Sequence, residues 1–309
     1  MTTAPSRAGD AAAVRAARTW LFVPGDRPER FDKAAGAGAD LVVLDLEDAV
    51  TTEAKGAARD NIVGWLLAGG RGVVRINGAD TSEHEADLRA LARLTVETRA
   101  GLSGLVGVIV PMAARADSLA AIHQTLGVPL IALIETATGV LDARELAGVP
   151  GVERLAFGAI DFSLDIDAVE QPDTLRYARS HLVLASRAAG LAGPIDGVTV
   201  DLSSAEPTAA DARAGRALGM GGKLCVHPMQ IAPTAEAFAP TPDEITWAEG
   251  VLAAVAAAQA DGSTTGAIRF EGQMIDEPVL ERARRILDRV AHEPKPTLAR
   301  TPEPGEGGS

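Results

Sequence analysis

The chain has 309 residues, which leaves open one large domain with appendages or two smaller domains. Its formal net charge of −13 argues against a general nucleic-acid-binding or anionic-membrane surface, because either partner would repel the protein as a whole. A single cysteine, Cys225, excludes an intramolecular disulfide and fits a reducing compartment. No apolar stretch approaches the roughly 18 residues of a membrane span and no secretory segment opens the chain, so we expect a cytoplasmic protein.

Eight short apolar runs follow one another along the chain, each separated from the next by a longer stretch with helical spacing. The runs are TWLFV (19–23), LVVLD (41–45), GVVRI (72–76), VGVIVP (106–111), PLIALIE (129–135), RLAFGA (154–159), GVTVD (197–201) and KLCVH (223–227). Such runs are typical of parallel strands that are buried on both faces and joined by helices. Eight of them predict an α/β fold, a closed (β/α)8 TIM barrel, with a doubly wound open sheet as the alternative.

Local signals mark some helix boundaries. Pro28 can open the first helix after a strand, with Asp26 nearby as a cap. The segment TPDE at 241–244 opens an Ala-rich helix that ends near Gln259. Beyond it come a Gly/Ser/Thr linker, a strand-like run and a last amphipathic helix. This C-terminal strand/helix extension is surplus to a barrel and can pack on a neighbouring subunit.

The order of elements predicts four parts of the chain. Residues 1–18 form a disordered N-terminal tail and residues 19–260 form the TIM-barrel catalytic domain. Residues 261–292 form the C-terminal extension, and the Pro/Gly-rich residues 293–309 form a disordered tail.

Two carboxylates follow neighbouring runs at the end where barrel enzymes place their chemistry. Glu135 ends the fifth run and Asp161 follows the sixth, about one strand-helix unit later. This spacing predicts equivalent heights on adjacent strands, about 5 Å apart. Converging carboxylates raise each other's pKa unless a cation lies between them, so the pair predicts a Mg²⁺ site. Capping of the following helices is the alternative for both residues.

Arg75 lies at the end of the third run, close to the acidic residues that follow the second. It can form a salt bridge with Asp45 or Asp48, or it can bind a substrate carboxylate through its planar guanidinium.

Arg27, Arg30 and Lys33 lie on the first turn of the helix that starts at Pro28. They can meet phosphates near the positive helix end, or they can form an exposed basic face.

The histidines and the cysteine carry weaker signals. His84 and His123 lie away from strand ends and are expected at the surface. His227 follows the eighth run, where a structural role and a catalytic role are equally open. Cys225 lies in the apolar run KLCVHP, which predicts a buried core thiol.

Seven ordered blocks of sequence resemble the CitE-like CoA-ester lyases, relatives of the citrate lyase β subunit within the HpcH/HpaI aldolase superfamily. The blocks are WLFVPGDRPERFDKA, LVVLDLEDAV, VVRIN, LIALIETATGV, GAIDFSLDI, KLCVHPMQI and FEGQMIDEPVL. The resemblance runs from about Thr19 to Leu287 and implies a TIM barrel that is usually a trimer.

The resemblance also implies roles for single residues. Glu135 and Asp161 fall on the family's Mg²⁺ ligands, and Arg75 falls on its substrate-gripping arginine. Glu47 and Asp48 fall on its acidic pair after the second strand, and Glu47 is the catalytic candidate of the two.

The MIDEP block belongs to the malyl-CoA and citramalyl-CoA lyase branch. It places Asp276 as a proton-transfer residue that enters the neighbouring subunit's site. The presence of this block favours a free-standing CoA lyase over a citrate lyase subunit that works on an acyl-carrier protein.

The implied activity is a Mg²⁺-dependent cleavage, or formation, of a 3-hydroxyacyl-CoA such as malyl-CoA or citramalyl-CoA, with an acyl-CoA and a 2-oxo acid as the other partners. Some relatives also hydrolyse the thioester. The chain departs from the family pattern at Met112, where lysine is usual, and at Ile160, where an acidic residue is common. Two alternatives stay open: an aldolase for free hydroxy-oxo acids that does not use CoA and, because of these two departures, a catalytically silent CoA-binding or assembly subunit.

Overall fold

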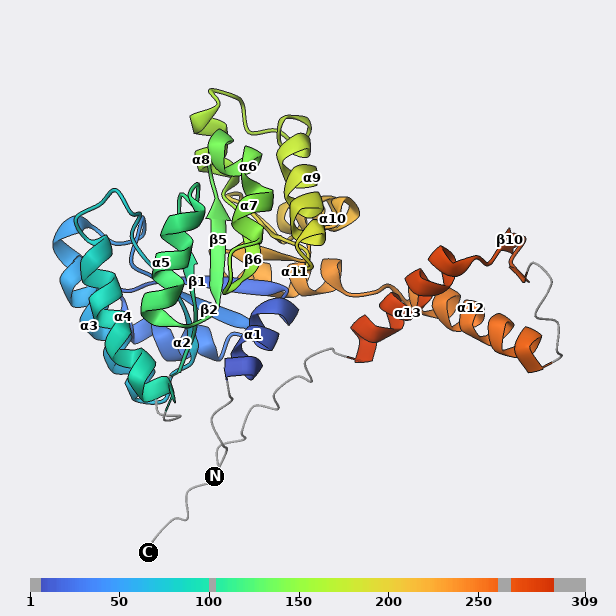
Figure 1. Ribbon diagram of the computed structural model, residues 1–309, viewed down its shortest axis with the longest axis horizontal. Coiled ribbons are helices and arrows are strands. Elements are labelled where there is room, and N and C mark those ends of the chain that lie inside the picture. The colour runs from blue at the N-terminus through green and yellow to red at the C-terminus, as the bar shows by residue number, and fades with distance from the viewer. Residues whose placement is uncertain (1–6, 100–103, 261–267, 292–309) are drawn as a thin grey trace, which may run out of the picture. The chain divides into compact units, whose positions relative to one another are not determined.

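A computed structural model describes residues 7–99, 104–260 and 268–291, and its first unit is a closed barrel of eight parallel strands (Figure 1). The strands are β1 (Thr19–Pro24), β2 (Leu41–Asp45), β3 (Gly72–Arg75), β4 (Leu105–Val110), β5 (Leu130–Ile134), β6 (Val152–Phe157), β7 (Ile195–Asp196) and β8 (Gly222–Cys225). Trp20 of β1 pairs with Leu41 of β2 on one side and with Leu224 of β8 on the other, which closes the sheet. The closed barrel is therefore confirmed, and the open sheet is excluded.

Helices surround the strands on the outside of the barrel (Figure 1). In chain order they are α1 (Arg7–Ala16), η1 (Pro28–Arg30), α2 (Phe31–Ala35), η2 (Thr52–Ala54), α3 (Lys55–Leu67), α4 (His84–Arg99), α5 (Ala116–Leu126), α6 (Ala137–Leu141), α7 (Ala143–Ala147), α8 (Ala159–Asp165), α9 (Pro172–Ala188), α10 (Glu206–Leu218), η3 (Pro228–Gln230) and α11 (Ile231–Phe238).

The strands are continuous apolar runs because both of their faces are buried. On β2, for example, Val43 packs inside the barrel with Val73 and Ile131, whereas Leu44 packs outward in the layer between strands and helices. This alternation builds an inner and an outer core from aliphatic side chains, as expected for a packed barrel.

The seventh strand differs from its prediction. It comprises Ile195 and Asp196, and the run at 197–201 has no strand structure, with Val200 66% exposed. The strand ends early because side chains take over its polar groups. The next residue, Gly197, donates its amide to Oδ1 of Asp196 at 2.9 Å, and its carbonyl accepts a hydrogen bond from Nζ of Lys223 at 2.5 Å. Apolar composition alone could not reveal this pairing.

The N-terminal tail was also predicted wrongly, because residues 7–16 form α1. Ala11, Val14 and Ala17 are buried, and Val14 packs with the inner core beside Trp20. Arg154 of β6 donates hydrogen bonds to the carbonyls of Val14 and Ala17 and so satisfies the end of the helix. The helix thus covers the end of the barrel at which the strands begin, and residues 1–6 lie outside the described part of the chain.

The second unit begins after Phe238 and contains α12 (Pro242–Ala260), the hairpin β9 (Arg269–Phe270) with β10 (Gln273–Met274), and α13 (Glu277–Ala291). Its core is formed by Ala248, Val251, Leu280, Ala283 and Ile286. The prediction that 19–260 form one domain placed α12 with the barrel, whereas this helix packs against α13.

The predicted opening of α12 at TPDE is confirmed, and the structure shows a capping box there. Oγ1 of Thr241 accepts the Glu244 amide at 3.1 Å, and the Glu244 carboxylate accepts the Thr241 amide at 2.8 Å. The predicted strand-like run and last helix are present as β9 and α13. The predicted disordered tail at 293–309 lies outside the described residues. Among the described helices, none has the length and apolar character needed to cross a membrane.

Candidate active site

A cavity of about 310 Å³ opens where the strands of the barrel end. Its charged lining residues are Asp45, Asp48, Arg75, Glu135 and Asp161. Its apolar lining comes from Phe22, Ala49, Leu133, Phe157, Ala159, Ile160, Val198, Leu224 and Val226. The carboxylates and the arginine that the sequence singled out after four different strands therefore meet in one space. This is the usual place for chemistry in an α/β barrel.

Glu135 directly follows β5 and is only 4% exposed. Its Oε2 accepts the backbone amide of Met112 at 2.8 Å, and Met112 adopts a left-handed φ of 49°. Burial raises the pKa of Glu135 to about 7; the Met112 amide opposes this, while the charges of Asp161 and Asp48 add to it. The buried carboxylate therefore lies where a cation would be favoured.

Asp161 does not sit at the height that the sequence predicted. Ile134 of β5 is level with Phe157 of β6, so the residue level with Glu135 is Gly158, and Asp161 lies on the first turn of α8. It nevertheless lines the same cavity as Glu135.

Neither carboxylate caps a helix in the way the alternative required. The cap of α6 is Thr136, whose Oγ1 accepts the Gly139 amide at 3.0 Å, and the cap position of α8 is Gly158. A different acid, Asp165 on α8, accepts the Ala137 amide at 2.7 Å and ties α8 to the start of α6.

Arg75 is held by three carboxylates after β2. Its Nε and Nη2 each lie 2.7 Å from an oxygen of Asp45, and its Nη1 lies 3.0 Å from Glu47 and 3.2 Å from Asp48. Burial opposes its charge, but the hydrogen bonds and charge of Asp45, followed by Glu47 and Asp48, raise the pKa of Arg75. The salt bridge considered from the sequence is therefore present, and the planar Nε/Nη2 edge is already occupied by Asp45. Of the two carboxylates at Nη1, the Asp48 side chain is 72% exposed and the Glu47 side chain is 16% exposed.

The pKa of Glu47 is raised far above that of an exposed glutamate. Burial raises the pKa of Glu47 to about 8. The positive charge of Arg75 lowers the pKa, but the negative charges of Asp48, Glu135 and Asp45 add to the effect of burial. The protonated form of Glu47 is therefore favoured relative to an exposed glutamate, although Arg75 lies beside it.

Arg27 precedes η1, Arg30 ends it and Lys33 lies on α2. All three are exposed, and these elements follow β1 at the same end of the barrel as the cavity. They are not among the residues that line the cavity. The predicted cap Asp26 is wrong, because the cap position of η1 is Arg27 and no side chain bonds there.

Asp276 lies in the second unit at the start of α13. Its Oδ1 accepts the Val279 amide at 3.0 Å, so its visible contact is a helix cap, and its side chain is exposed.

The remaining histidines and the cysteine have structural contacts. His227 caps η3, where Nδ1 accepts the Met229 amide at 3.2 Å, so its structural interpretation is the one observed. His84 is only 8% exposed and bonds the Asn77 carbonyl, which corrects its predicted surface position, while His123 is half-buried beside the Val128 carbonyl. Cys225 is a buried core thiol, as predicted.

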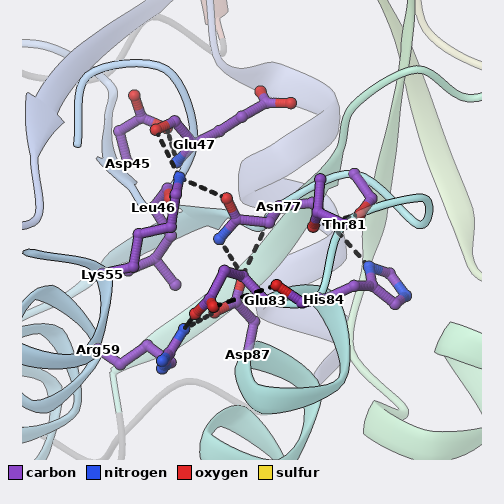
Figure 2. Close-up of polar contacts among 12 residues, drawn as sticks. Asp45, Leu46, Glu47, Lys55, Arg59, Asn77, Thr81, Glu83, His84 and Asp87 are labelled. Atoms are coloured by element: carbon purple, nitrogen blue, oxygen red, sulfur yellow. Dashed lines mark hydrogen bonds and ion pairs between the residues drawn. The ribbon is translucent and has the colours of Figure 1, made fainter. Parts of the chain in front are cut away.

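The sequence analysis missed a group of polar residues that lies behind the β2 loop. Lys55, Arg59, Asn77 and Asp87 form a continuous chain of hydrogen bonds there (Figure 2). Asn77 comes two residues after Arg75, so a polar side chain just past a strand end was the available signal.

The donor set around Glu135 is suited to Mg²⁺. Glu135 and Asp161 supply hard carboxylate oxygens, and Mg²⁺ is commonly held by one or two carboxylates with water and substrate as its other ligands. Within residues 7–99, 104–260 and 268–291, no group of three or more His, Cys, Asp or Glu side chains has a geometry that could hold a metal ion. The two-carboxylate arrangement fits Mg²⁺ better than Zn²⁺, which takes three or four protein ligands.

Comparison with known proteins gives a consistent picture. Residues 18–228 match the HpcH/HpaI aldolase/citrate lyase family. A citrate lyase subunit beta-like protein of Deinococcus radiodurans is 41% identical over 286 residues, which cover 89% of this chain and 97% of the relative. A (3S)-malyl-CoA thioesterase of Cereibacter sphaeroides is 31% identical over 277 residues, which cover 87% of this chain and 93% of the relative.

A solved structure supports the same relationship. The protein CitE from Mycobacterium tuberculosis, in complex with magnesium, acetoacetate and coenzyme A, is 36% identical with a TM-score of 0.74. The match covers 90% of this chain and 99% of that one. The resemblance noted in the sequence is thereby confirmed, and the chain belongs to the HpcH/HpaI aldolase/citrate lyase family, a family of aldolase-type lyases.

Proposed function

We propose that this enzyme cleaves, or forms, the carbon–carbon bond of a 3-hydroxyacyl-CoA such as malyl-CoA or citramalyl-CoA. The products of cleavage are an acyl-CoA and a 2-oxo acid. The observation that carries the proposal is the meeting of Arg75, Glu135 and Asp161 in one cavity at the strand ends. A related structure that contains magnesium, acetoacetate and coenzyme A supports the same class of ligand.

The residues in and beside the cavity bind the substrate and the metal ion. The Nη1 edge of Arg75 binds the substrate carboxylate, with the exposed Asp48 side chain moving aside. Glu135 and Asp161 hold Mg²⁺, which when bound supplies a Lewis acid and a template for the oxo acid. Glu47 is not among the residues that line the cavity, so it supports the substrate through its contact with Arg75, and its raised pKa favours the protonated form.

Cleavage requires two proton movements. A base removes the proton of the 3-hydroxyl group, the new carbonyl forms, and the electron pair of the broken bond moves to the α-carbon of the acyl-CoA enolate. Asp276 of a neighbouring subunit in a homotrimer delivers the proton that converts this enolate into the acyl-CoA. Light scattering of the purified protein tests the trimer, and a monomer would rule out this source of the proton.

The direct test is turnover with and without metal. Malyl-CoA, citramalyl-CoA and hydroxymethylglutaryl-CoA are incubated with the protein in Mg²⁺ or in chelator, and the products are identified by mass spectrometry. We expect an acyl-CoA and a 2-oxo acid in Mg²⁺ only, while turnover that survives chelation would refute the metal site. Release of free CoA with an intact acyl carbon chain would reveal thioester hydrolysis. Glu135→Gln removes a charge without changing shape, so it should abolish metal-dependent turnover and leave the fold intact.

Two other functions give different results in the same experiment. An aldolase for free hydroxy-oxo acids would be indifferent to simultaneous replacement of Arg27, Arg30 and Lys33, because only a CoA substrate brings phosphates to that basic surface. A silent subunit would bind CoA without turning over any ester.

A further inference from the structure

The loop that follows β2 is held from behind by one lysine. Nζ of Lys55, at the start of α3, lies 2.8 Å from the Leu46 carbonyl, 3.0 Å from the Glu47 carbonyl and 2.6 Å from Oδ1 of Asn77 (Figure 2). An ammonium group has three N–H donors, and these three acceptors use all of them. Two successive carbonyls of the loop therefore converge on one cation.

The other side of the same loop carries the groups that hold Arg75. Asp45 accepts both the Glu47 amide at 3.0 Å and the Ala49 amide at 3.1 Å while it binds Arg75. Carboxylates thus face the cavity and carbonyls face Lys55. The loop between Asp45 and Ala49 is fixed on both sides.

Lys55 is itself fixed by a chain of partners. The Asn77 side chain donates to Asp87 at 2.6 Å, and Asp87, which is fully buried, accepts Nη1 of Arg59 at 3.0 Å. Arg59 also lies 2.7 Å from Glu83 (Figure 2). This chain connects the ends of β2 and β3 to α3 and α4, so the ammonium group has little freedom to move.

We propose that Lys55 is a positioning residue, which sets the carboxylates of Glu47 and Asp48, and through them Arg75, in the geometry that the substrate carboxylate requires. Lys55 is not among the residues that line the cavity, so it acts through the loop and not on the substrate. The effect on turnover rests on the proposed function, whereas the effect on the loop does not.

Hydrogen exchange tests the loop directly in Lys55→Met, with Arg89→Met as a control for the loss of one cation. Arg89 lies on α4 with a 70% exposed side chain, and its ion-pair partner is Glu85, which is not a member of the Lys55 chain. The amides of Glu47, Ala49 and Val50 should exchange roughly tenfold faster or more in Lys55→Met, as expected when charge-assisted hydrogen bonds are lost. The amides of β5 should keep their rates in both variants. Unchanged exchange in the loop, or acceleration spread equally over all strands, overturns the proposal.

Chemical rescue separates positioning from general damage. In Lys55→Cys the thiolate displaces bromide from 2-bromoethylamine, which restores an ammonium group on a side chain of lysine length. The native Cys225 is 0% exposed, and treated wild-type protein controls for its reaction. The treated variant should regain slow exchange in the loop, and failure to regain it counts against the proposal.

Kinetics complete the test if the wild-type enzyme cleaves a CoA ester. Lys55→Met should lower kcat/KM by roughly 10- to 100-fold, since misplacement of a binding group by about 1 Å has this effect. Its affinity for Mg²⁺ should stay unchanged, because Glu135 and Asp161 lie on other elements. A kcat/KM equal to that of Arg89→Met would overturn the proposal. If the wild type cleaves no ester, the proposed function fails and hydrogen exchange alone decides the role of Lys55.

Discussion

The carboxyl group of Glu135 occupies space that exists because residue 158 has no side chain. A Cβ atom on Gly158 would lie 2.4 Å from Cγ and 2.5 Å from Oε1 of Glu135. Ile134 and Phe157 are paired where β5 and β6 end, and Glu135 and Gly158 are the residues that directly follow them.

Gly158→Ala should therefore displace the Glu135 carboxylate without unfolding the barrel, because the conflict is with the end of a side chain. We expect Mg²⁺ affinity to fall roughly 10- to 100-fold, the effect typical of removing support from a metal ligand. Isothermal titration calorimetry measures the change. Gly148→Ala is the matched control, since a Cβ there would lie 3.4 Å from the nearest atom, the Glu145 carbonyl oxygen. Equal affinities in the two variants would contradict the assignment of Glu135 as a ligand.

The stability of the metal-free protein should fall as pH rises from about 4.5 to about 8. The pKa values of Glu135 and Glu47 are raised to about 7 and about 8 from 4.5, so in this interval the folded state binds more protons than the unfolded state. The free energy of unfolding then decreases with pH. Urea unfolding in chelator measures it, and the double variant Glu47→Gln, Glu135→Gln should lose most of this slope. A slope that is the same in both proteins would show that these carboxyls do not cause it.

Arg154→Met should destabilise the barrel although it removes a buried charge. Burial lowers the pKa of Arg154 to about 9, so the guanidinium stays charged at neutral pH and donates to the carbonyls of Val14, Ala17 and Gly193. Methionine would leave the carbonyls of Val14 and Gly193 without this donor and Ala17 with only the Trp20 indole at 3.3 Å, for a loss of roughly 2–4 kcal/mol in the free energy of unfolding. Arg15→Met is the control, because Arg15 has a 53% exposed side chain in a surface ion pair with Glu153. Equal unfolding midpoints in urea would show that the end of α1 does not depend on Arg154.

Mixed oligomers should show whether Asp276 works in a neighbouring subunit. Asp276→Asn and Glu135→Gln are each expected to be inactive alone. After the two are unfolded together and refolded, some sites combine an intact Asp276 with an intact Glu135, and lyase activity should return. Co-refolding each variant with itself is the control. Absence of recovery from mixtures shown by mass spectrometry to contain hybrids would place the proton donor elsewhere.

Much of the barrel could be predicted because buried parallel strands leave a local pattern. Seven of the eight runs coincide with strands, since each had to be apolar on both faces. The seventh failed because the side chains of Asp196 and Lys223 bond the backbone amide and carbonyl of Gly197, the groups that would continue β7. The helix α1 was missed for a related reason. Its polar, Ala-rich sequence resembles a disordered tail, and only its contacts with Arg154 and with the end of the barrel bury one of its faces.

At the site, residue types and their order along the chain were enough to select Arg75, Glu135 and Asp161, because charged groups at strand ends are exceptional in apolar runs. The tertiary structure decided how these groups are used. It placed Asp161 on a helix turn instead of level with Glu135, bound the planar edge of Arg75 to Asp45, and set Lys55 behind the loop. These relationships depend on contacts between segments that are distant in sequence and meet only in the folded barrel, so no local pattern in the sequence predicts them.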